Sequence, residues 1–177
     1  MIEIKIIEAK HQEDIKIKNE SFLLWGRMIP SYENESWHYS IRHDHPKEIS
    51  QMCFPDEAYD YEEMSKHSTF IGAYEHNQCI GLAIIQEAFF NYMYLYDLKV
   101  STTYRKKGIA EQLIEKAKEV CHAKGYQGIH TIAQDNNLSA CLFYVHTGFS
   151  IGGLDTHVYK GTNQEGKADI HFYLNLP

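Results

Sequence analysis

The segments YMYLYDLKV (92–100), STTYRKKG (101–108) and IAEQLIEKAKEVC (109–121) follow one another and decide the fold. The first segment is rich in aromatic and aliphatic residues, which predicts a β-strand. In the last segment, apolar residues recur every three or four positions, which predicts an amphipathic helix ended by Gly125. A short basic loop therefore joins a strand to the beginning of a long helix.

The loop Arg105-Lys106-Lys107-Gly108-Ile109-Ala110 has a composition suited to binding phosphate groups. The first N–H groups of a helix lack partners inside the helix and carry the positive end of its dipole, so pyrophosphate oxygens can accept hydrogen bonds from them. Gly108 has no Cβ to block the approach, Ala110 is small, and Arg105 adds positive charge. By itself, the hexapeptide fits a basic turn that caps a surface helix equally well. Because the patterns GxxxxGK[ST] and GxGxxG are absent, a generic ATPase or dinucleotide enzyme is disfavoured.

Three segments upstream of this region also have the composition of strands. We expect strands at residues 2–8, 69–74 and 80–90, with a polar turn at 76–78. The second and third of these are expected to form an antiparallel meander with residues 92–100. Residues 11–66 are acidic and aromatic and are interrupted by prolines, so we expect short helices and loops there, with one helix near 57–66.

Downstream of the long helix, shorter elements alternate. The expected elements are a strand at 129–133, a helix at 137–147 ended by Gly148, and strands at 149–154, 156–160 and 168–174. This order predicts an α+β fold with an antiparallel N-terminal half and a βαβα unit in the middle.

Composition limits the kind of protein. With 177 residues and 44% apolar residues, the chain is expected to fold as a single domain, residues 1–177. A net charge of −7 without clustered Lys and Arg argues against nucleic-acid binding. The chain lacks a run of about 18 apolar residues and a signal-peptide pattern, so we expect no membrane segment and a cytoplasmic protein. The cysteines lack C-x-x-C spacing and the histidines lack an H-E-x-x-H frame, so we expect free buried thiols and no metal site.

Two motifs in order resemble those of a known superfamily. Val100-x-x-x-Tyr104-Arg105-Lys106-Lys107-Gly108-Ile109-Ala110 resembles the Arg/Gln-x-x-Gly-x-Gly/Ala signature of the GNAT superfamily of N-acetyltransferases. Asn136-x-x-x-Ala140-x-x-Phe143-Tyr144-x-x-x-Gly148-Phe149 is similar to the next motif of that superfamily. The resemblance covers about residues 69–160. It implies direct, acetyl-CoA-dependent transfer to an amine in a ternary complex. The implied fold is a mixed, mostly antiparallel sheet flanked by helices, with a splayed strand pair at the cofactor site.

The resemblance also implies roles for single residues. The backbones of Leu98 and Val100 would pair with the pantetheine arm, Asn136 would contact the cofactor, and Arg105 would add charge beside it. Tyr144 matches the general acid that protonates the departing thiolate. A tyrosine suits that role because its pKa of about 10 keeps it protonated at neutral pH. The other interpretation of Tyr144 is a packed helix aromatic. The N–H groups that would hold the pyrophosphate belong to Lys106, Lys107, Gly108, Ile109 and Ala110.

The amine must lose a proton before it can attack. A primary amine with a pKa of about 10.4 is rarely neutral at pH 7, and reaching its neutral form costs about 4–5 kcal/mol without help. Regular alternation places Tyr94 and Tyr96 on one strand face and Leu95 and Asp97 on the other. In the superfamily, the face that carries Tyr94 and Tyr96 points at the acceptor. Asp97 could act as the base directly if the strand bulges, or through a water, and Glu87 is the other candidate. Either carboxylate could instead be a capping or solvated group.

A narrower resemblance reaches most of residues 22–176. The stretches 29–37, 134–144, 152–156 and 172–174 are similar to streptothricin (nourseothricin) acetyltransferases, which acetylate an amine of a cationic antibiotic and so confer resistance to it. Glu33, Glu35 and Asp155 could then form an acidic pocket lined by the aromatic residues Tyr32 and Trp37, which would favour a cation. The alternative is that Tyr32 and Trp37 pack a loop over the sheet.

Two departures from that family fall near the acceptor side. The family tends to carry a Glu-Asp pair where this chain has Tyr96-Asp97, and basic residues where it has Gln86-Glu87-Ala88. Acetylation of a peptide or protein amine, or a non-catalytic acyl-CoA-binding domain, therefore stay open as alternatives. The aromatic C-terminal strand could pair with a second copy or be an ordinary edge, so a homodimer also stays open.

Overall fold

The computed structural model describes residues 1–88 and 90–177 and divides them into two compact units. The first unit consists of Met1–Glu20, Phe54–Ile129 and Leu176–Pro177. The second unit consists of Ser21–Cys53 and His130–Asn175. Strands and helices occur in both units, which confirms the predicted α+β class.

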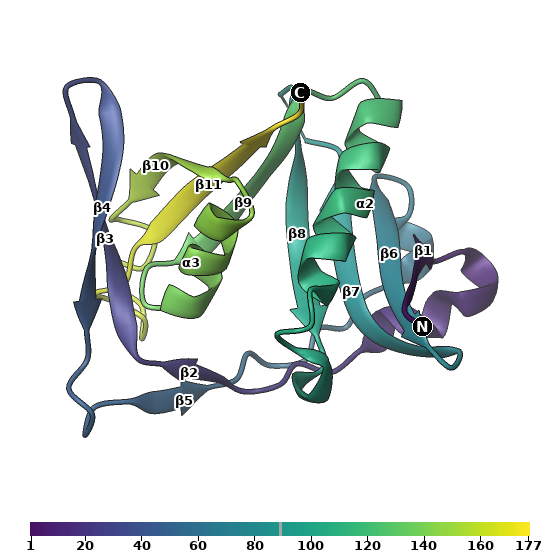
Figure 1. Cartoon of the computed structure of the whole chain (residues 1–177), viewed down its shortest axis with the longest axis horizontal. Helices are drawn as coiled ribbons and strands as arrows, with labels where there is room; N and C mark the ends of the chain where they lie inside the picture. The colour runs from purple at the N-terminus through teal and green to yellow at the C-terminus, as the bar shows by residue number, and fades with distance from the viewer. Residues whose placement is uncertain (89) are drawn as a thin grey trace. The chain divides into compact units, whose positions relative to one another are not determined.

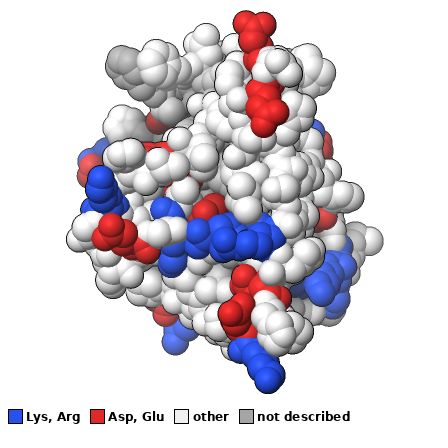
Figure 2. Space-filling view, turned by 90° about the vertical axis from the view of Figure 1, so that its left-hand side faces the viewer, with Lys and Arg blue, Asp and Glu red and all other residues white. Residues whose placement is uncertain are grey.

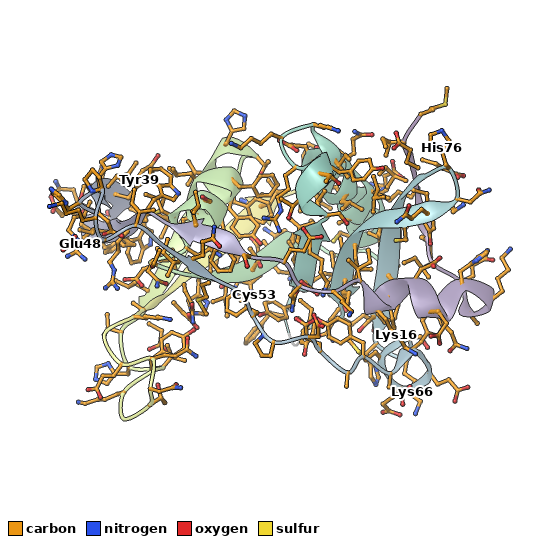
Figure 3. All side chains as sticks on the ribbon, turned by 90° about the horizontal axis from the view of Figure 1, so that it is seen from below. Lys16, Tyr39, Glu48, Cys53, Lys66 and His76 are labelled. Carbon is orange, nitrogen blue, oxygen red and sulfur yellow. The ribbon has the colours of Figure 1, made fainter. Side chains whose placement is uncertain are left out.

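The first unit contains the predicted antiparallel meander. Its strands are β1 (Glu3–Ile6), β6 (Ser68–Glu75), β7 (Gln78–Gln86) and β8 (Tyr92–Val100), in the order β1-β6-β7-β8 (Figure 1). His76 and Asn77 both have positive φ, as in the two-residue turn of a type I′ hairpin, and Figure 3 shows His76 at this turn. The strand expected at 80–90 ends earlier, at Gln86. Phe89, which belongs to that expected strand, lies outside the described residues.

The two faces of this sheet are covered by different elements. Helix α2 (Ile109–Ala123) packs against β6, β7 and β8, and its apolar residues Leu113, Ile114 and Ala117 are buried (Figure 1). Gly81 on β7 faces α2, because a Cβ there would lie 3.3 Å from Leu113. The neighbouring Leu82 must face the opposite side, because side chains alternate along a strand.

That opposite side carries an apolar cluster formed with two short helices. They are the 3₁₀ segment η1 (Ala9–Lys16) and α1 (Tyr61–Met64). The predicted helix near 57–66 is therefore present as a single turn, and the Asp60 side chain caps it by accepting a hydrogen bond from the Glu63 N–H at 3.1 Å. The cluster buries Ile7, Ile15, Phe70, Tyr74, Leu82 and Ile84.

The second unit contains the C-terminal strands and a helix. From His130 onward β9 (Gly128–Gln134) lies beside β11 (Asp169–Asn175), which pairs antiparallel with β10 (Ser150–Asp155). Helix α3 (Leu138–His146) begins after Asn137, whose side chain accepts from the Ala140 N–H. Gly148, with a φ of 94°, follows the end of the helix as predicted.

The expectation of helices and loops throughout residues 11–66 is wrong for residues 22–52. Residues 22–52 form β2 (Phe22–Leu24) paired with β5 (Ser50–Met52), and β3 (Gly26–Glu33) paired with β4 (Ser36–His43). Pro30 does not break β3, because in a two-stranded ladder each strand has an edge where a missing N–H is tolerated. The β3–β4 turn contains Asn34 and Glu35, both with positive φ, which fits a type I′ hairpin.

The strand expected at 156–160 is also wrong. The Asp155 carboxylate accepts hydrogen bonds from the N–H groups of His157 at 2.8 Å and Val158 at 3.1 Å. Such an Asx turn redirects the chain as soon as β10 ends.

Two further expectations concern the burial of the cysteine thiols and the lack of a membrane-spanning helix. Cys121 and Cys141 are buried, but Cys53 is exposed, so the expectation of uniformly buried thiols is wrong. Burial raises the pKa of both Cys121 and Cys141 to about 12. No helix in the described part of the chain combines the length and apolar character that a membrane span needs.

Gly26 tests the packing of β3 against α3. A Cβ at Gly26 would lie 2.7 Å from the Arg42 carbonyl oxygen and 2.8 Å from the Leu138 side chain. We expect Gly26→Ala to lower the free energy of unfolding by about 1–3 kcal/mol through overpacking, measured by urea denaturation. Gly153→Ala is the control, because its new Cβ would meet His171 at an ordinary 3.5 Å. Equal midpoints for the two variants would contradict this account of the packing.

Candidate functional site

The loop between β8 and α2 is folded back on itself. After the 3₁₀ turn η2 (Thr102–Tyr104), the Arg105 side chain donates from Nε to the Val100 carbonyl at 3.0 Å. Lys106 and Gly108 have φ of 60° and 73°, and Gly108 is the N-cap of α2. Left-handed residues within a turn gather successive backbone N–H groups into a concave, anion-binding arrangement.

This loop has the properties that the predicted phosphate site requires. The first-turn N–H groups of α2 lack acceptors inside the helix and lie at the positive end of its dipole. A Cβ placed on Gly108 would meet nothing within 4 Å, so the approach to these groups is open at that point. The Lys107 ammonium lies 5.0 Å from the centre of the Tyr104 ring, and the Tyr104 hydroxyl donates to Glu75 at 2.8 Å. The loop can therefore present its amides to a diphosphate with basic side chains beside them.

Strand β8 carries a β-bulge in front of this loop. Ile84 of β7 pairs with Asp97, whereas the next residue, Ile85, pairs with Leu95, so Tyr96 has no partner in the ladder. Paired residues share a face of the sheet. The pairing therefore places Leu95 on the α2 face and Asp97 on the opposite face. The expectation that Leu95 and Asp97 share a face is wrong, because the extra residue shifts the alternation by one.

The bulge brings Asp97 to the side of the sheet where Tyr94 lies. The rings of Tyr94 and Tyr96 are 6.1 Å apart and perpendicular, and the Tyr96 ring lies 6.0 Å from that of Tyr59. Tyr59 also donates its hydroxyl hydrogen to Asp97 Oδ2 at 2.8 Å. Burial, followed by the charge of Asp97, raises the pKa of Tyr59 well above its ordinary value, so this hydroxyl remains a donor at physiological pH. No sequence motif singles out Tyr59, which lies 38 residues from Asp97.

Lys99 completes this cluster. Its ammonium lies 3.0 Å from Asp97 Oδ2, 3.0 Å from Glu57 Oε2 and 3.2 Å from Asn19 Oδ1. The Lys99 side chain is only 10% exposed, and its ammonium lies 5.3 Å from the centre of the Tyr59 ring. The pKa of Glu57 is lowered: burial opposes the ionised form, but hydrogen bonds from Asn19 and Lys99 outweigh it.

Glu87, the other candidate base, lies in a different environment. It follows β7 on the surface and forms an ion pair with Lys124 at 2.6 Å. The hydrogen bond from Lys124, followed by the charge of Lys124, lowers the pKa of Glu87. This makes Glu87 a weaker base than an ordinary glutamate. The geometry of Glu87 therefore fits the other interpretation, a solvated surface carboxylate, better than a catalytic base.

In the second unit, Tyr144 lies on α3 and faces the core. It is 8% exposed, and its ring lies 5.2 Å from Phe149 and 5.4 Å from Phe172. These ring contacts hold the phenol ring against the core of the second unit. This geometry fits both interpretations of Tyr144: an aromatic side chain that packs in the core, and a general acid whose hydroxyl is held in one orientation.

Asn136, just after β9, has a buried amide oxygen without a hydrogen-bond partner among the described residues. A buried polar atom without a partner is costly in a folded protein. The amide of Asn136 is therefore available to a ligand donor, as expected for a residue that contacts the cofactor. Each of these two features, the open amides of the α2 loop in the first unit and the unpartnered amide oxygen of Asn136 in the second, has by itself the chemistry to accept part of an acyl-CoA ligand.

The residues expected to line an acidic acceptor pocket are only partly brought together. Tyr32 and Trp37 face each other across the β3–β4 hairpin with ring centres 5.1 Å apart, and Tyr32 is 59% exposed. Glu33 is exposed beside the turn, and Figure 2 shows acidic side chains at the tip of this hairpin. Asp155 instead holds the turn after β10, and among the described residues no hydrogen bond or ion pair joins it to the hairpin tip. The interpretation of Tyr32 and Trp37 as residues that pack a loop over the sheet is wrong, because they form a cross-strand pair.

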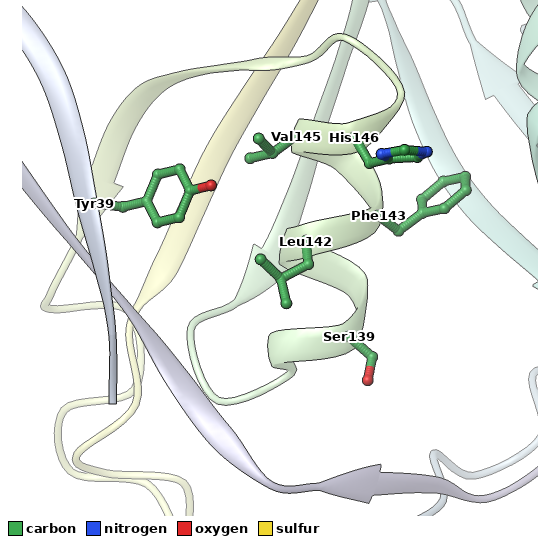
Figure 4. A pocket seen from close by; sticks show the side chains of 6 residues that line it. All are labelled: Tyr39, Ser139, Leu142, Phe143, Val145 and His146. Atoms are coloured by element: carbon green, nitrogen blue, oxygen red, sulfur yellow. The ribbon is translucent and has the colours of Figure 1, made fainter. Parts of the chain in front are cut away.

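An open pocket of about 490 Å³ lies beside α3 in the second unit. Figure 4 shows Tyr39 of β4 pointing its hydroxyl toward the helix, where Leu142 and Val145 face it. Tyr144 points into the core instead, so this pocket does not include it. Among the described residues, no group of three or more His, Cys, Asp or Glu is arranged to hold a metal ion.

Comparisons with known proteins agree with the sequence motifs. Residues 34–149 match the model of the acetyltransferase (GNAT) family. Streptothricin acetyltransferase A of Bacillus subtilis (strain 168) is 32% identical over 166 residues, which cover 94% of this chain and 95% of that protein. Streptothricin acetyltransferase of Escherichia coli is 31% identical over 99 residues, or 56% of this chain and 57% of that protein.

Solved structures show the same fold. A protein of Bacillus anthracis str. Ames, provisionally assigned as a streptothricin acetyltransferase and solved with acetyl coenzyme A, has a TM-score of 0.88 at 28% identity, covering 99% of this chain and 100% of that chain. Nourseothricin acetyltransferase has a TM-score of 0.80 at 19% identity and covers 99% of both chains. These findings confirm the GNAT resemblance seen in the two motifs. The chain belongs to the acetyltransferase (GNAT) family and is an N-acetyltransferase with acetyl-CoA as its co-substrate.

Proposed function

We propose that this acetyltransferase acetylates a primary amine of a small cationic molecule, a streptothricin-type antibiotic, and thereby gives resistance to it. The observation that carries the proposal is the 32% identity to streptothricin acetyltransferase A over 94% of this chain. The cluster at the β8 bulge supports it, because Asp97, Glu57 and three tyrosine rings favour an ammonium group. The buried thiols Cys121 and Cys141 fit a reducing compartment, and we infer that the enzyme acts in the cytoplasm.

The reaction requires one bond to form and one to break. The neutral amine nitrogen attacks the acetyl carbon, the carbon–sulfur bond of the thioester breaks, and the nitrogen loses a proton while the departing sulfur gains one. We assign donation of the second proton to the Tyr144 hydroxyl, and acceptance of the first to Asp97, directly or through a water. The ion pair of Glu87 with Lys124 makes Glu87 the weaker candidate.

The binding roles follow the same elements. The backbone N–H groups of Lys106 to Ala110 would hold the pyrophosphate beside Arg105, and the backbones of Leu98 and Val100 would meet the pantetheine arm. Asn136 would satisfy its buried amide oxygen with a cofactor donor. For the acceptor, we assign Tyr94 and Tyr96 in the first unit, and Tyr32, Glu33 and Trp37 at the hairpin. Asp155 is a weaker candidate, since its Oδ1 already accepts two backbone N–H groups of the turn after β10.

Turnover with streptothricin tests the substrate directly. We expect the wild-type protein to release free thiol from acetyl-CoA when streptothricin is added, and mass spectrometry to find one acetyl group on the antibiotic. A panel of lysine, polyamines and peptides with free N-termini serves as the comparison. Turnover with peptides alone would identify a peptide acetyltransferase. Tight acetyl-CoA binding without turnover of any amine would identify a binding domain.

Tyr144→Phe tests the proton donor. The variant keeps the ring that packs against Phe149 and Phe172, so the fold and acetyl-CoA affinity should be retained. We expect kcat to fall by about 100-fold or more, because a positioned general acid is lost. Tyr159→Phe is the control in the same unit, since it removes a hydroxyl bound to Asp169 at 2.7 Å. Equal kcat values for Tyr144→Phe and the wild type would remove this residue from the mechanism.

Gly108→Leu tests the phosphate loop, and the chain supplies a matched control. Gly108 and Gly125 flank α2 with φ of 73° and 77°, and a Cβ at either would meet nothing within 4 Å. A leucine in this conformation should cost about 1–2 kcal/mol of stability at both positions. We expect only Gly108→Leu to lose acetyl-CoA binding in calorimetry, because its side chain covers the loop amides. Equal acetyl-CoA affinity in the two variants would count against the phosphate site.

A further inference from the structure

The Asp97 carboxylate is held through one of its two oxygens. The Tyr59 hydroxyl at 2.8 Å and the Lys99 ammonium at 3.0 Å both contact Oδ2. Among the described residues, Oδ1 has no hydrogen-bond partner, and the Asp97 side chain is 15% exposed. The carboxylate is thus fixed in orientation while one acceptor oxygen stays available.

The surroundings of this oxygen have the chemistry of an ammonium site. The cluster already binds one primary ammonium, that of Lys99, through Asp97, Glu57 and Asn19. Two carboxylates and one ammonium leave the group with a net negative charge, so a second cation is attracted electrostatically. The 46% exposed ring of Tyr96 offers a π-face next to the carboxylate.

Asp97 lies on the strand whose backbone at Leu98 and Val100 is proposed to meet the pantetheine arm. Asp97 precedes Val100 by three residues, a distance of about 10 Å at the rise of a strand. Val100 leads through η2 into the loop with Gly108. The bulge at Tyr96 orients Asp97 away from α2, toward the half-buried Tyr59. Bulges commonly reorient side chains next to active sites.

We propose that Tyr59 is a positioning residue for the acceptor: its hydroxyl, together with Lys99, fixes Asp97 Oδ2 so that Oδ1 accepts a hydrogen bond from the primary ammonium of the substrate. This inference rests on the proposed function, because it concerns the same acceptor. In this proposal the enzyme selects a primary amine through Tyr59 and Lys99, two residues to which the resemblance to known acetyltransferases assigned no role. Because Tyr59 acts through Asp97, its loss should weaken amine binding and leave acetyl-CoA binding intact.

Tyr59→Phe tests the proposal, because the change should affect the KM for the amine but not the KM for acetyl-CoA. The variant keeps the ring beside Lys99 and Tyr96 and removes only the hydroxyl. We expect the KM for the amine to rise by about tenfold, as for the loss of a hydrogen bond to a charged group, with the KM for acetyl-CoA within about twofold of the wild type.

Tyr74→Phe is the matched control in the same unit. Its hydroxyl also donates to a carboxylate, Asp14 Oδ2, at 2.7 Å, but Tyr74 belongs to the apolar cluster under β6. It should lower thermal stability as Tyr59→Phe does and leave the KM for the amine unchanged. An unchanged amine KM in Tyr59→Phe, or equal changes in both variants, would overturn the inference.

The wild type separates this inference from the proposed function. If the wild type does not acetylate streptothricin, the proposed function fails. The variants are then compared with the primary amine of the panel that the wild type acetylates fastest, and the same KM criteria decide. A wild type that acetylates no primary amine would overturn both.

Discussion

One additional residue in β8 determines which side chains of that strand face α2 and which lie on the opposite face of the sheet. Upstream of Tyr96, regular pairing sends Leu95 toward α2. Downstream, the alternation has shifted by one position, so Val100 remains in the core while Asp97 and Lys99 lie on the opposite face. Without the bulge, a carboxylate at position 97 would face the apolar side of α2, where an unpaired charge is very costly. The polar cluster of the first unit therefore depends on this local change of register.

Both units bury charged groups, and in both the charges are satisfied by several partners. In the first unit, Lys99 contacts two carboxylates and an amide oxygen. In the second unit, the Arg27 guanidinium lies 3.3 Å from Asp135, which also accepts from the Ala168 N–H at 3.0 Å. Such pairs offset their desolvation only when the remaining donors and acceptors are also used. The buried ion pairs of Lys99 and Arg27 therefore form in only one arrangement of their strands, so they help to hold each strand in its register.

Helix α2 combines two functions through its two ends. Glycines with left-handed φ flank it, Gly108 before the first turn and Gly125 after the last. The C-terminal glycine terminates the helix, with its N–H bonded to the His122 carbonyl at 3.0 Å. At the N-terminal end, the same backbone freedom leaves the first amides uncovered. The buried face of the helix fixes this end against β7 and β8, and the hydrogen bonds of Arg105 to the Val100 carbonyl and of Tyr104 to Glu75 hold the loop itself.

The sequence alone predicted the elements whose pattern is local. The 3.6-residue period located α2, and the composition of residues 92–100 located β8 with its observed bounds. The glycine and basic residues of the loop between them predict a phosphate site. The strands within 22–52 do not follow from the sequence pattern, because a proline such as Pro30 usually interrupts a strand, although a two-stranded ladder tolerates it. Only the tertiary structure decided that Tyr59 and Lys99 hold Asp97, that Lys124 binds Glu87, and that Tyr96 is the bulged residue. Periodicity reports the burial of a residue relative to its neighbours in the chain, whereas hydrogen bonds and strand register join residues that are far apart in the sequence and meet only when the sheet has formed.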